Sequence, residues 1–209
     1  MATSSGNGEK QKIGVMGGTF DPIHKGHVQV ALEAQKQLEL RQVIFIPAGK
    51  PWMKSDRQIT IAEHRVAMVR LAIRQYPGFS LSTIEIERQG PTLTVDTLRE
   101  LNTVYDSRAY LFLILSWNTL TELPKWKEPE EIVRLATIVT APRPGYKKPD
   151  LDLLEGKIPG ITHKLIWLDK PVINISATSI RARVAHGKPI SDMVAPLVER
   201  YIKKNRLYT

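Results

Sequence analysis

The stretch KIGVMGGTFDPIHKGH, residues Lys12–His27, joins a short apolar segment to two glycines and then to two histidines three residues apart. An apolar segment that ends in Gly-Gly is typical of a buried parallel strand that feeds a tight turn. From His24 to about Leu40 the apolar residues follow helical spacing, and Gln42–Gly49 has the composition of a second strand closed by proline and glycine. The stretch therefore opens a predicted strand–helix–strand unit.

The same alternation continues to the end of the chain. Thr60, with Glu63 three residues later, predicts a capping box ahead of a helix over Ala62–Tyr76. The further strands that we expect are Phe79–Ile86, Ala109–Leu115, Thr137–Ala141 and Lys164–Leu168, and the further helices are Thr94–Tyr105, Glu128–Ala136, one from about Ser176 and one near Ser191–Lys204.

Strands that alternate with helices at these lengths predict an α/β fold, Rossmann-like and doubly wound, with a mostly parallel sheet and helices on both faces. Ligands of such sheets bind outside the carboxyl ends of the strands. The segments expected at that rim are Gly17–His27, Gly49–Lys54, Gly90–Thr94, Ser116–Trp126 and Arg143–Tyr146.

Length and composition predict one compact domain. The 209 residues, 42% of them apolar and 24% charged, can bury a core of their own, and we assign residues 1–11 to a flexible tail and 12–209 to a single domain. The absence of cysteine excludes disulfides, thiolate metal sites and a cysteine nucleophile, and it agrees with a cytoplasmic location. Neither a secretory signal nor a membrane span is expected.

The formal net charge of +9 raises the question of nucleic-acid binding. The basic residues are scattered, and the densest groups lie over Arg181–Lys188 and Arg200–Arg206. A solvated helical face explains these groups better than a nucleic-acid surface does, so no nucleic-acid partner is predicted.

The glycine turn predicts an anion site, because a strand, a Gly-Gly-Thr turn and a helix N-terminus direct backbone N–H groups at one place. Neither the dinucleotide fingerprint nor the P-loop spacing is present. His24 and His27 lie one helical turn apart, where imidazolium rings would stabilise charge on a phosphoryl group. A helix cap beside a surface histidine, or a metal site, would also explain such a pair. No third metal ligand is evident among His64, His163 and His186, so no protein metal site is predicted.

The string GGTFDPIHKGH, followed late in the chain by ISATSIR (Ile175–Arg181), resembles the signature of the nucleotidyltransferase superfamily. Between them, GPTLTVDTLRELN (Gly90–Asn102), LPKWKEPEEI (Leu123–Ile132) and PRPGY (Pro142–Tyr146) are similar to landmarks of the bacterial nicotinate-nucleotide adenylyltransferases. The resemblance implies transfer of AMP from ATP onto nicotinate mononucleotide, giving deamido-NAD and pyrophosphate. ATP and a pyridine mononucleotide are then the partners, and Mg²⁺ arrives with ATP.

The resemblance also implies roles for residues of this chain. The catalytic set holds the ATP phosphates and the leaving pyrophosphate, and it consists of His24, His27, Lys54 and Arg181. Trp126 would stack on the pyridine ring, and Thr92 or Thr94 would meet its carboxylate. The remaining nucleotide-binding residues are the turn residues Gly17, Gly18, Thr19 and Phe20, Asn118 as a ribose contact on the adenosine side, and the hydroxyl-bearing Ser176, Thr178 and Ser179.

Two departures from the family pattern keep alternatives open. Ser116-Trp117-Asn118 stands where the family usually has Gly-x-Asp, and Lys50–Lys54 replaces Asn-Pro-Pro-His-Lys. The same chemistry on another acceptor, such as nicotinamide mononucleotide or phosphopantetheine, therefore remains an alternative. So does a non-catalytic nucleotide-binding paralogue. The oligomeric state, a homodimer included, stays open.

Overall fold

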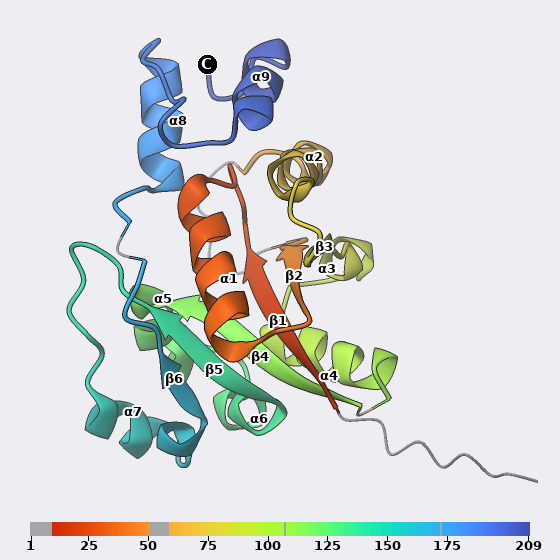
Figure 1. The fold of residues 1–209 in the computed structure, drawn as a ribbon, viewed down its shortest axis with the longest axis vertical. Coiled ribbons are helices and arrows are strands. Elements are labelled where there is room, and N and C mark those ends of the chain that lie inside the picture. The colour runs from red at the N-terminus through yellow and green to blue at the C-terminus, as the bar shows by residue number, and fades with distance from the viewer. Residues whose placement is uncertain (1–9, 51–58, 107, 172) are drawn as a thin grey trace, which may run out of the picture.

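The centre of the molecule is a parallel β-sheet (Figure 1). The computed structural model describes residues 10–50, 59–106, 108–171 and 173–209, and within them six strands follow the order β3-β2-β1-β4-β5-β6, with every neighbouring pair parallel. The strands are β1 (Gln11–Gly18), β2 (Gln42–Pro47), β3 (Phe79–Leu81), β4 (Ala109–Ser116), β5 (Ala136–Ala141) and β6 (Leu165–Trp167). The predicted Rossmann-like α/β class is confirmed.

Helices cover both faces of this sheet, as expected for a doubly wound fold. One face carries α1 (Lys25–Leu38) and α2 (Ala62–Ile73). The helices α8 (Ala177–Ala185) and α9 (Pro196–Lys204) add buried residues to the same core from beyond the carboxyl ends of the strands (Figure 1). The other face carries α3 (Ile84–Glu87), α4 (Thr94–Val104), α5 (Trp117–Glu122), the 3₁₀ turn η2 (Leu123–Lys125), α6 (Pro129–Leu135), α7 (Leu151–Lys157) and the 3₁₀ turn η3 (Ile161–Lys164). No helix in the described part of the chain is long and apolar enough to cross a membrane.

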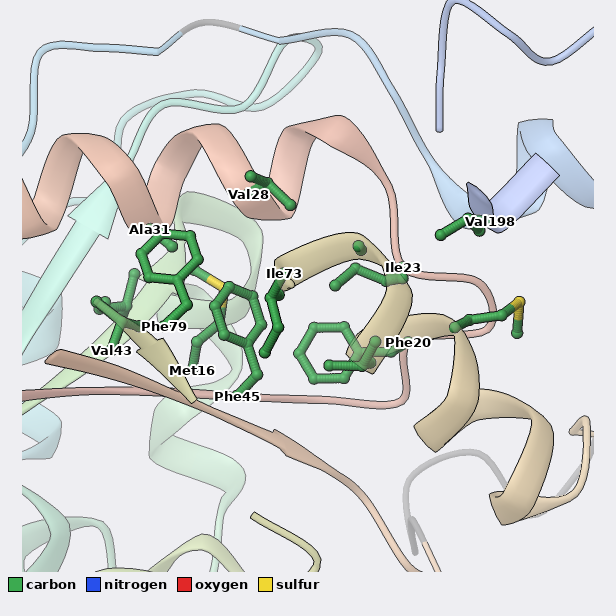
Figure 2. Packing of buried hydrophobic residues seen from close by; sticks show 14 of the residues in the cluster. Met16, Phe20, Ile23, Val28, Ala31, Val43, Phe45, Ile73, Phe79 and Val198 are labelled. Atoms are coloured by element: carbon green, nitrogen blue, oxygen red, sulfur yellow. The ribbon is translucent and has the colours of Figure 1, made fainter. Parts of the chain in front are cut away.

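Two hydrophobic cores result from the alternation of side chains along the strands. In β1, Ile13 and Val15 belong to the core beneath α4, whereas Met16 belongs to the core beneath α1. Figure 2 shows Met16 packed with Phe45 and Phe79 below Ala31 of α1. Each such fully buried side chain contributes about 1.5–3 kcal/mol to stability, so the two cores fix the sheet between its helical layers.

Two predicted local features are wrong in detail. The strand expected over Phe79–Ile86 ends at Leu81, and the short helix α3 begins at Ile84. The capping box expected from Thr60 does not form, because Ile61 is the N-cap residue of α2 and has no side-chain cap. The backbone of Thr60 is used instead: its N–H donates to Asp21 Oδ2 at 3.4 Å and its carbonyl accepts from Arg65 Nε at 2.8 Å.

The strand order creates a crevice between β1 and β4. From β1 the chain runs into α1 on one face, and from β4 it runs into α5 and α6 on the other face. Because the two outgoing segments diverge, a gap opens at the carboxyl ends of these neighbouring strands, which is where open α/β sheets bind ligands.

Candidate active site

A cavity of about 380 Å³ lies at this divergence. Gly17 and Gly18 of β1 and Leu115 and Ser116 of β4 contribute to its wall. One side, here called the α1 side, is formed by His24, Gly26, His27, Val30, Ile173 and Ile175; the opposite α4 side is formed by Glu85, Thr92, Leu93, Thr94, Thr97, Leu98 and Trp126. A volume of this size suits a small-molecule site, and its two sides suit a ligand with two chemically different ends.

The two histidines stand stacked on the α1 side. Their ring centroids are 3.7 Å apart with planes inclined by 25°, and the edge contact of Phe20 with the His27 ring has a centroid distance of 5.1 Å. The backbone N–H of His24 donates to His27 Nδ1 at 3.2 Å. Since Nδ1 accepts this bond, a neutral His27 ring carries its proton on Nε2.

His24 is a buried, neutral ring rather than the imidazolium that we expected from the sequence. Its exposed fraction is 8%, and burial, together with the charge of Arg143, lowers its pKa to about 3. Its Nδ1 is buried and has no hydrogen-bond partner in the described part of the chain. A buried nitrogen of this kind is costly to leave unsatisfied, so it suits an incoming ligand atom.

Gly26 explains the spacing of the histidine motif. A Cβ atom at this position would lie 3.0 Å from His24 Nδ1 and 3.1 Å from its Cε1. Such contacts are tighter than ordinary packing, so any side chain here would press on the ring. Sequence reasoning quoted this glycine within the motif but did not assign it a role.

Asp21 ties the glycine turn to distant parts of the chain. Its buried carboxylate accepts from the Tyr208 hydroxyl at 2.8 Å, and its backbone carbonyl accepts from Arg181 Nη1 at 2.7 Å. Burial raises the pKa of Tyr208, and the nearby charge of Asp21 raises that pKa further, so the phenol remains a donor. These bonds bring the start of α8 and the end of the chain against the turn.

Arg65 supports the same turn from α2. Its side chain is 2% exposed, and its guanidinium donates to the carbonyls of Thr60 (2.8 Å), Thr19 (2.9 Å) and Gly49 (3.4 Å). One cation therefore holds together the ends of β1 and β2 and the start of α2. Neither Arg65 nor Tyr208 was predicted as a site residue, because nothing local in the sequence indicates such distant partners.

The two predicted phosphate motifs lie in contact through Arg181 and Asp21, but only some of their residues line the cavity. Gly17 and Gly18 line the cavity, whereas Thr19 and Phe20 are buried and do not line it. At the start of α8, Ser176 Oγ caps the helix by accepting from the Ser179 N–H at 3.1 Å. The hydroxyl of Thr178 accepts from Arg181 Nη2 at 3.3 Å, and both Thr178 and Ser179 are exposed. Lys54 lies outside the described residues.

The α4 side gathers the residues predicted for the acceptor, which are Trp126, Thr92 and Thr94. Asn118, predicted to contact a ribose on the adenosine side, also lines the cavity. The indole Nε1 of Trp126 is buried and finds no acceptor among the described residues. Thr92 is tied to Lys50 through both backbone and hydroxyl, and Asn118 Oδ1 accepts from Ser116 Oγ at 2.8 Å.

The structure adds two charged residues that sequence reasoning did not single out. Arg143 lines the cavity near His24, and the buried carboxyl of Glu85 lines it on the α4 side. The sequence places Arg143 in the PRPGY landmark, but its neighbours come from remote segments. Glu85 lay in a predicted strand and carried no motif.

The donor set does not fit a dedicated divalent-metal cage. Across residues 10–50, 59–106, 108–171 and 173–209, no group of three or more histidine, aspartate or glutamate side chains lies close enough together to hold a metal ion. Hard divalent cations prefer several oxygen ligands, and Glu85 is the only carboxylate among the described residues that line the cavity.

The sequence of this chain is similar to those of known proteins. Residues 15–183 match the family model described as cytidylyltransferase-like. A Dehalococcoides mccartyi protein named probable nicotinate-nucleotide adenylyltransferase is 47% identical over 197 residues, which cover 94% of this chain and 97% of that protein. A Thermomicrobium roseum protein of the same name is 41% identical over 94% of this chain and 91% of its own length.

Solved structures agree in fold. A Plasmodium falciparum nicotinic acid mononucleotide adenylyltransferase complexed with NaAD superposes with a TM-score of 0.77 at 22% identity, over 95% of this chain and 97% of that chain. The same Plasmodium enzyme complexed with APC superposes with a TM-score of 0.75. At this identity the likeness concerns the fold alone.

Proposed function

We propose, from the premise that this chain belongs to the cytidylyltransferase-like family, that it works as a nicotinate-nucleotide adenylyltransferase. The enzyme transfers AMP from ATP to nicotinate mononucleotide and releases pyrophosphate. The observation that carries the proposal is the cavity at the carboxyl ends of β1 and β4. It has a histidine pair on one side and, on the other, a tryptophan N–H that finds no acceptor among the described residues. We assign the α1 side to the ATP triphosphate and the α4 side to the pyridine nucleotide.

The reaction needs no covalent enzyme intermediate. An oxygen of the acceptor 5′-phosphate attacks the α-phosphorus of ATP, the bond from that phosphorus to the bridging β-phosphate oxygen breaks, and pyrophosphate leaves with the bonding electrons. Catalysis then consists of positioning and of stabilising phosphoryl charge. The neutral His24 ring donates one hydrogen bond to a phosphate oxygen, and His27 Nε2 supplies a second.

The α1 side and the start of α8 take the triphosphate. Backbone amides at Gly17 and Gly18, together with the N-terminus of α1, favour a bound anion. Arg181, held against the turn by Asp21, adds a cation near the leaving pyrophosphate. Ser176, Thr178 and Ser179 offer hydroxyls at the same helix end, and Lys54 is proposed as a further phosphate ligand.

The α4 side takes the pyridine nucleotide. Trp126 provides a ring on which nicotinate stacks, and Thr92 and Thr94 provide hydroxyls for its carboxylate. Asn118 is proposed instead to contact the ribose on the adenosine side, through a neutral hydrogen bond in place of a charge-assisted one. Any Mg²⁺ is carried by the ATP phosphates, because the described residues offer no cage for it.

An acceptor panel tests the assignment. We expect pyrophosphate release with ATP and nicotinate mononucleotide, and a kcat/KM at least ~10-fold lower for nicotinamide mononucleotide, because the proposed role of the two threonines is to bind a carboxylate. Phosphopantetheine serves as the unrelated phosphate acceptor. A preference for the amide over the acid would reject the nicotinate assignment, and tight ATP binding without turnover on any acceptor would favour the non-catalytic alternative.

Substitution of Trp126 tests the division between the two sides. In Trp126→Ala we expect KM for nicotinate mononucleotide to rise by about 10-fold, because stacking contributes on the order of 1–3 kcal/mol per base, while KM for ATP changes by less than about 3-fold. Trp126→Phe keeps an aromatic surface and should lose less. Steady-state kinetics with each substrate varied in turn makes the measurement. An equal rise of both KM values would contradict the assignment.

A further inference from the structure

Glu85 is a buried carboxyl in the wall of the proposed acceptor site that the reaction described above does not use. It lies in α3, its exposed fraction is 6%, and it lines the cavity on the same side as Thr92, Thr94 and Trp126. Acidic side chains are rarely buried unless they are paired or protonated. The proposed acceptor, nicotinate mononucleotide, differs from its amide by a carboxylate. A second carboxyl group in the wall of its binding site would therefore affect how it binds.

The hydrogen bonds around Glu85 leave its charge only partly compensated. The Thr97 hydroxyl donates to Glu85 Oε1 at 2.7 Å, and the same hydroxyl oxygen accepts from Arg88 Nη1 at 3.1 Å. Arg88 is thus separated from the carboxyl by the threonine, and its guanidinium is paired with Glu100 at the surface. The threonine, rather than the arginine, is the direct partner.

Among the described residues, the other elements packed around Glu85 add no direct counter-ion. At the end of β2, Gly49 lies close to the backbone carbonyl of Glu85, and a Cβ there would fall 2.1 Å from that oxygen. Lys127 and Arg143 reach the cavity wall from the loops after η2 and β5. Among the described residues, Arg88 is the charged side chain whose field lowers the pKa of Glu85.

Burial raises the pKa of Glu85 to about 7, against the smaller lowering effects of the Thr97 hydrogen bond and the charge of Arg88. A raised pKa means that burial disfavours the charged form of this carboxyl group. Below about pH 7 Glu85 is therefore neutral, and above that pH it is an anion. Since Oε1 already accepts from Thr97, the proton resides on Oε2.

We propose that Glu85 is a specificity-determining residue of the acceptor site, whose charge state sets how strongly the enzyme prefers the nicotinate acid over its amide. This inference rests on the proposed function. A protonated Glu85 does not repel the nicotinate carboxylate, whereas an ionised Glu85 does so across a poorly solvated wall. By linkage, binding of the acid acceptor takes up a proton at high pH and binding of the amide does not.

The acid and amide mononucleotides form a matched pair for the test. Both carry the same 5′-phosphate and the same pyridinium charge, so the titration of the phosphate and any attraction of the pyridinium to Glu85 cancel in the ratio of their dissociation constants. The quantity to measure is Kd of nicotinamide mononucleotide divided by Kd of nicotinate mononucleotide, by calorimetry between about pH 6 and pH 8.5. Turnover is assayed separately.

In the unmodified protein this ratio is expected to fall by about 10-fold across that range, with its midpoint near the pKa of Glu85. Glu85→Gln should abolish the fall, because the amide stays neutral. Glu87→Gln, on the exposed side of the same helix, is the matched control and should keep the profile of the unmodified protein. A fall that survives unchanged in Glu85→Gln would overturn the proposal.

Thr97→Val provides a second, independent variant should Glu85→Gln fail to fold. It removes the donor that lowers the pKa of Glu85, so the midpoint should move to higher pH by about one unit. An unmoved midpoint would overturn the proposal. Binding of the acid acceptor without pyrophosphate release would reject the proposed function but leave the Kd ratio as a valid test, whereas no binding of that acceptor would reject both.

Discussion

Replacing His24 with alanine is expected to lower kcat by about 10²-fold or more, the usual loss when one preorganised donor to a developing anion is removed. The buried Nδ1 of this ring lacks a partner in the described part of the chain, and the ring stacks on His27 at the cavity wall. The interaction is made mainly in the transition state, so KM for ATP should change much less than kcat. Steady-state pyrophosphate release makes the measurement.

The charge of the ring is tested by a conservative variant. Because burial and Arg143 hold the pKa of His24 near 3, the free enzyme presents a neutral donor at pH 7. His24→Asn also presents a neutral N–H, so it should recover part of the turnover that alanine loses. For the same reason the kcat/KM profile, which reports the free enzyme, should show no inflection from His24 between about pH 5 and 8.

His163→Ala is the matched control. This exposed histidine lies in η3, which directly precedes β6. It is therefore at the amino ends of the strands, away from the cavity at their carboxyl ends, and its loss should leave turnover within about 2-fold. If His24→Ala retained turnover within about 3-fold of the unmodified enzyme, the histidine pair would not be the phosphate-stabilising element. Equal losses in both histidine variants would point to a general effect on folding.

The fold was predictable because its signals are local. Apolar segments such as Ala109–Leu115 and the helical spacing after His24 indicate strands and helices directly, and both are present as β4 and α1. The Ile84–Glu87 segment was misassigned because alternation of isoleucine and glutamate fits a strand, whereas the burial of Glu85 depends on its tertiary partner Thr97. Local pattern does not reveal such a partner.

The candidate site was predictable only where a motif carried it. The comparisons confirm the family resemblance that the GGTFDPIHKGH and ISATSIR strings indicated, and the structure brings both strings together through Arg181 and Asp21. The individual roles of the predicted site residues remain predictions. Arg65, Tyr208 and Glu85 were missed because their function follows from contacts across 46, 187 and 12 positions of sequence, respectively.

Replacing Arg65 with alanine is expected to destabilise the protein by about 3–5 kcal/mol, the cost of breaking a buried ionic arrangement by removing one partner. The change leaves the carbonyls of Thr19, Thr60 and Gly49 without their donor. It also removes the cation beside the buried carboxylate of Asp21. For a domain of this size the loss corresponds to a Tm lowered by roughly 6–20 °C, measurable by differential scanning calorimetry.

Two further variants separate the geometry of Arg65 from its charge. Arg65→Lys keeps the cation but cannot offer three fixed N–H groups to three carbonyls, so it should recover only a minor part of the lost stability. Arg70→Ala, on the exposed side of the same helix, should shift Tm by less than about 2 °C. Full stability in Arg65→Lys would mean that charge alone supports the turn. A Tm unchanged in Arg65→Ala would mean that the glycine turn keeps its shape without the guanidinium. The hydrogen bonds of Tyr208 and Arg181 to Asp21 would then be the contacts that hold the turn.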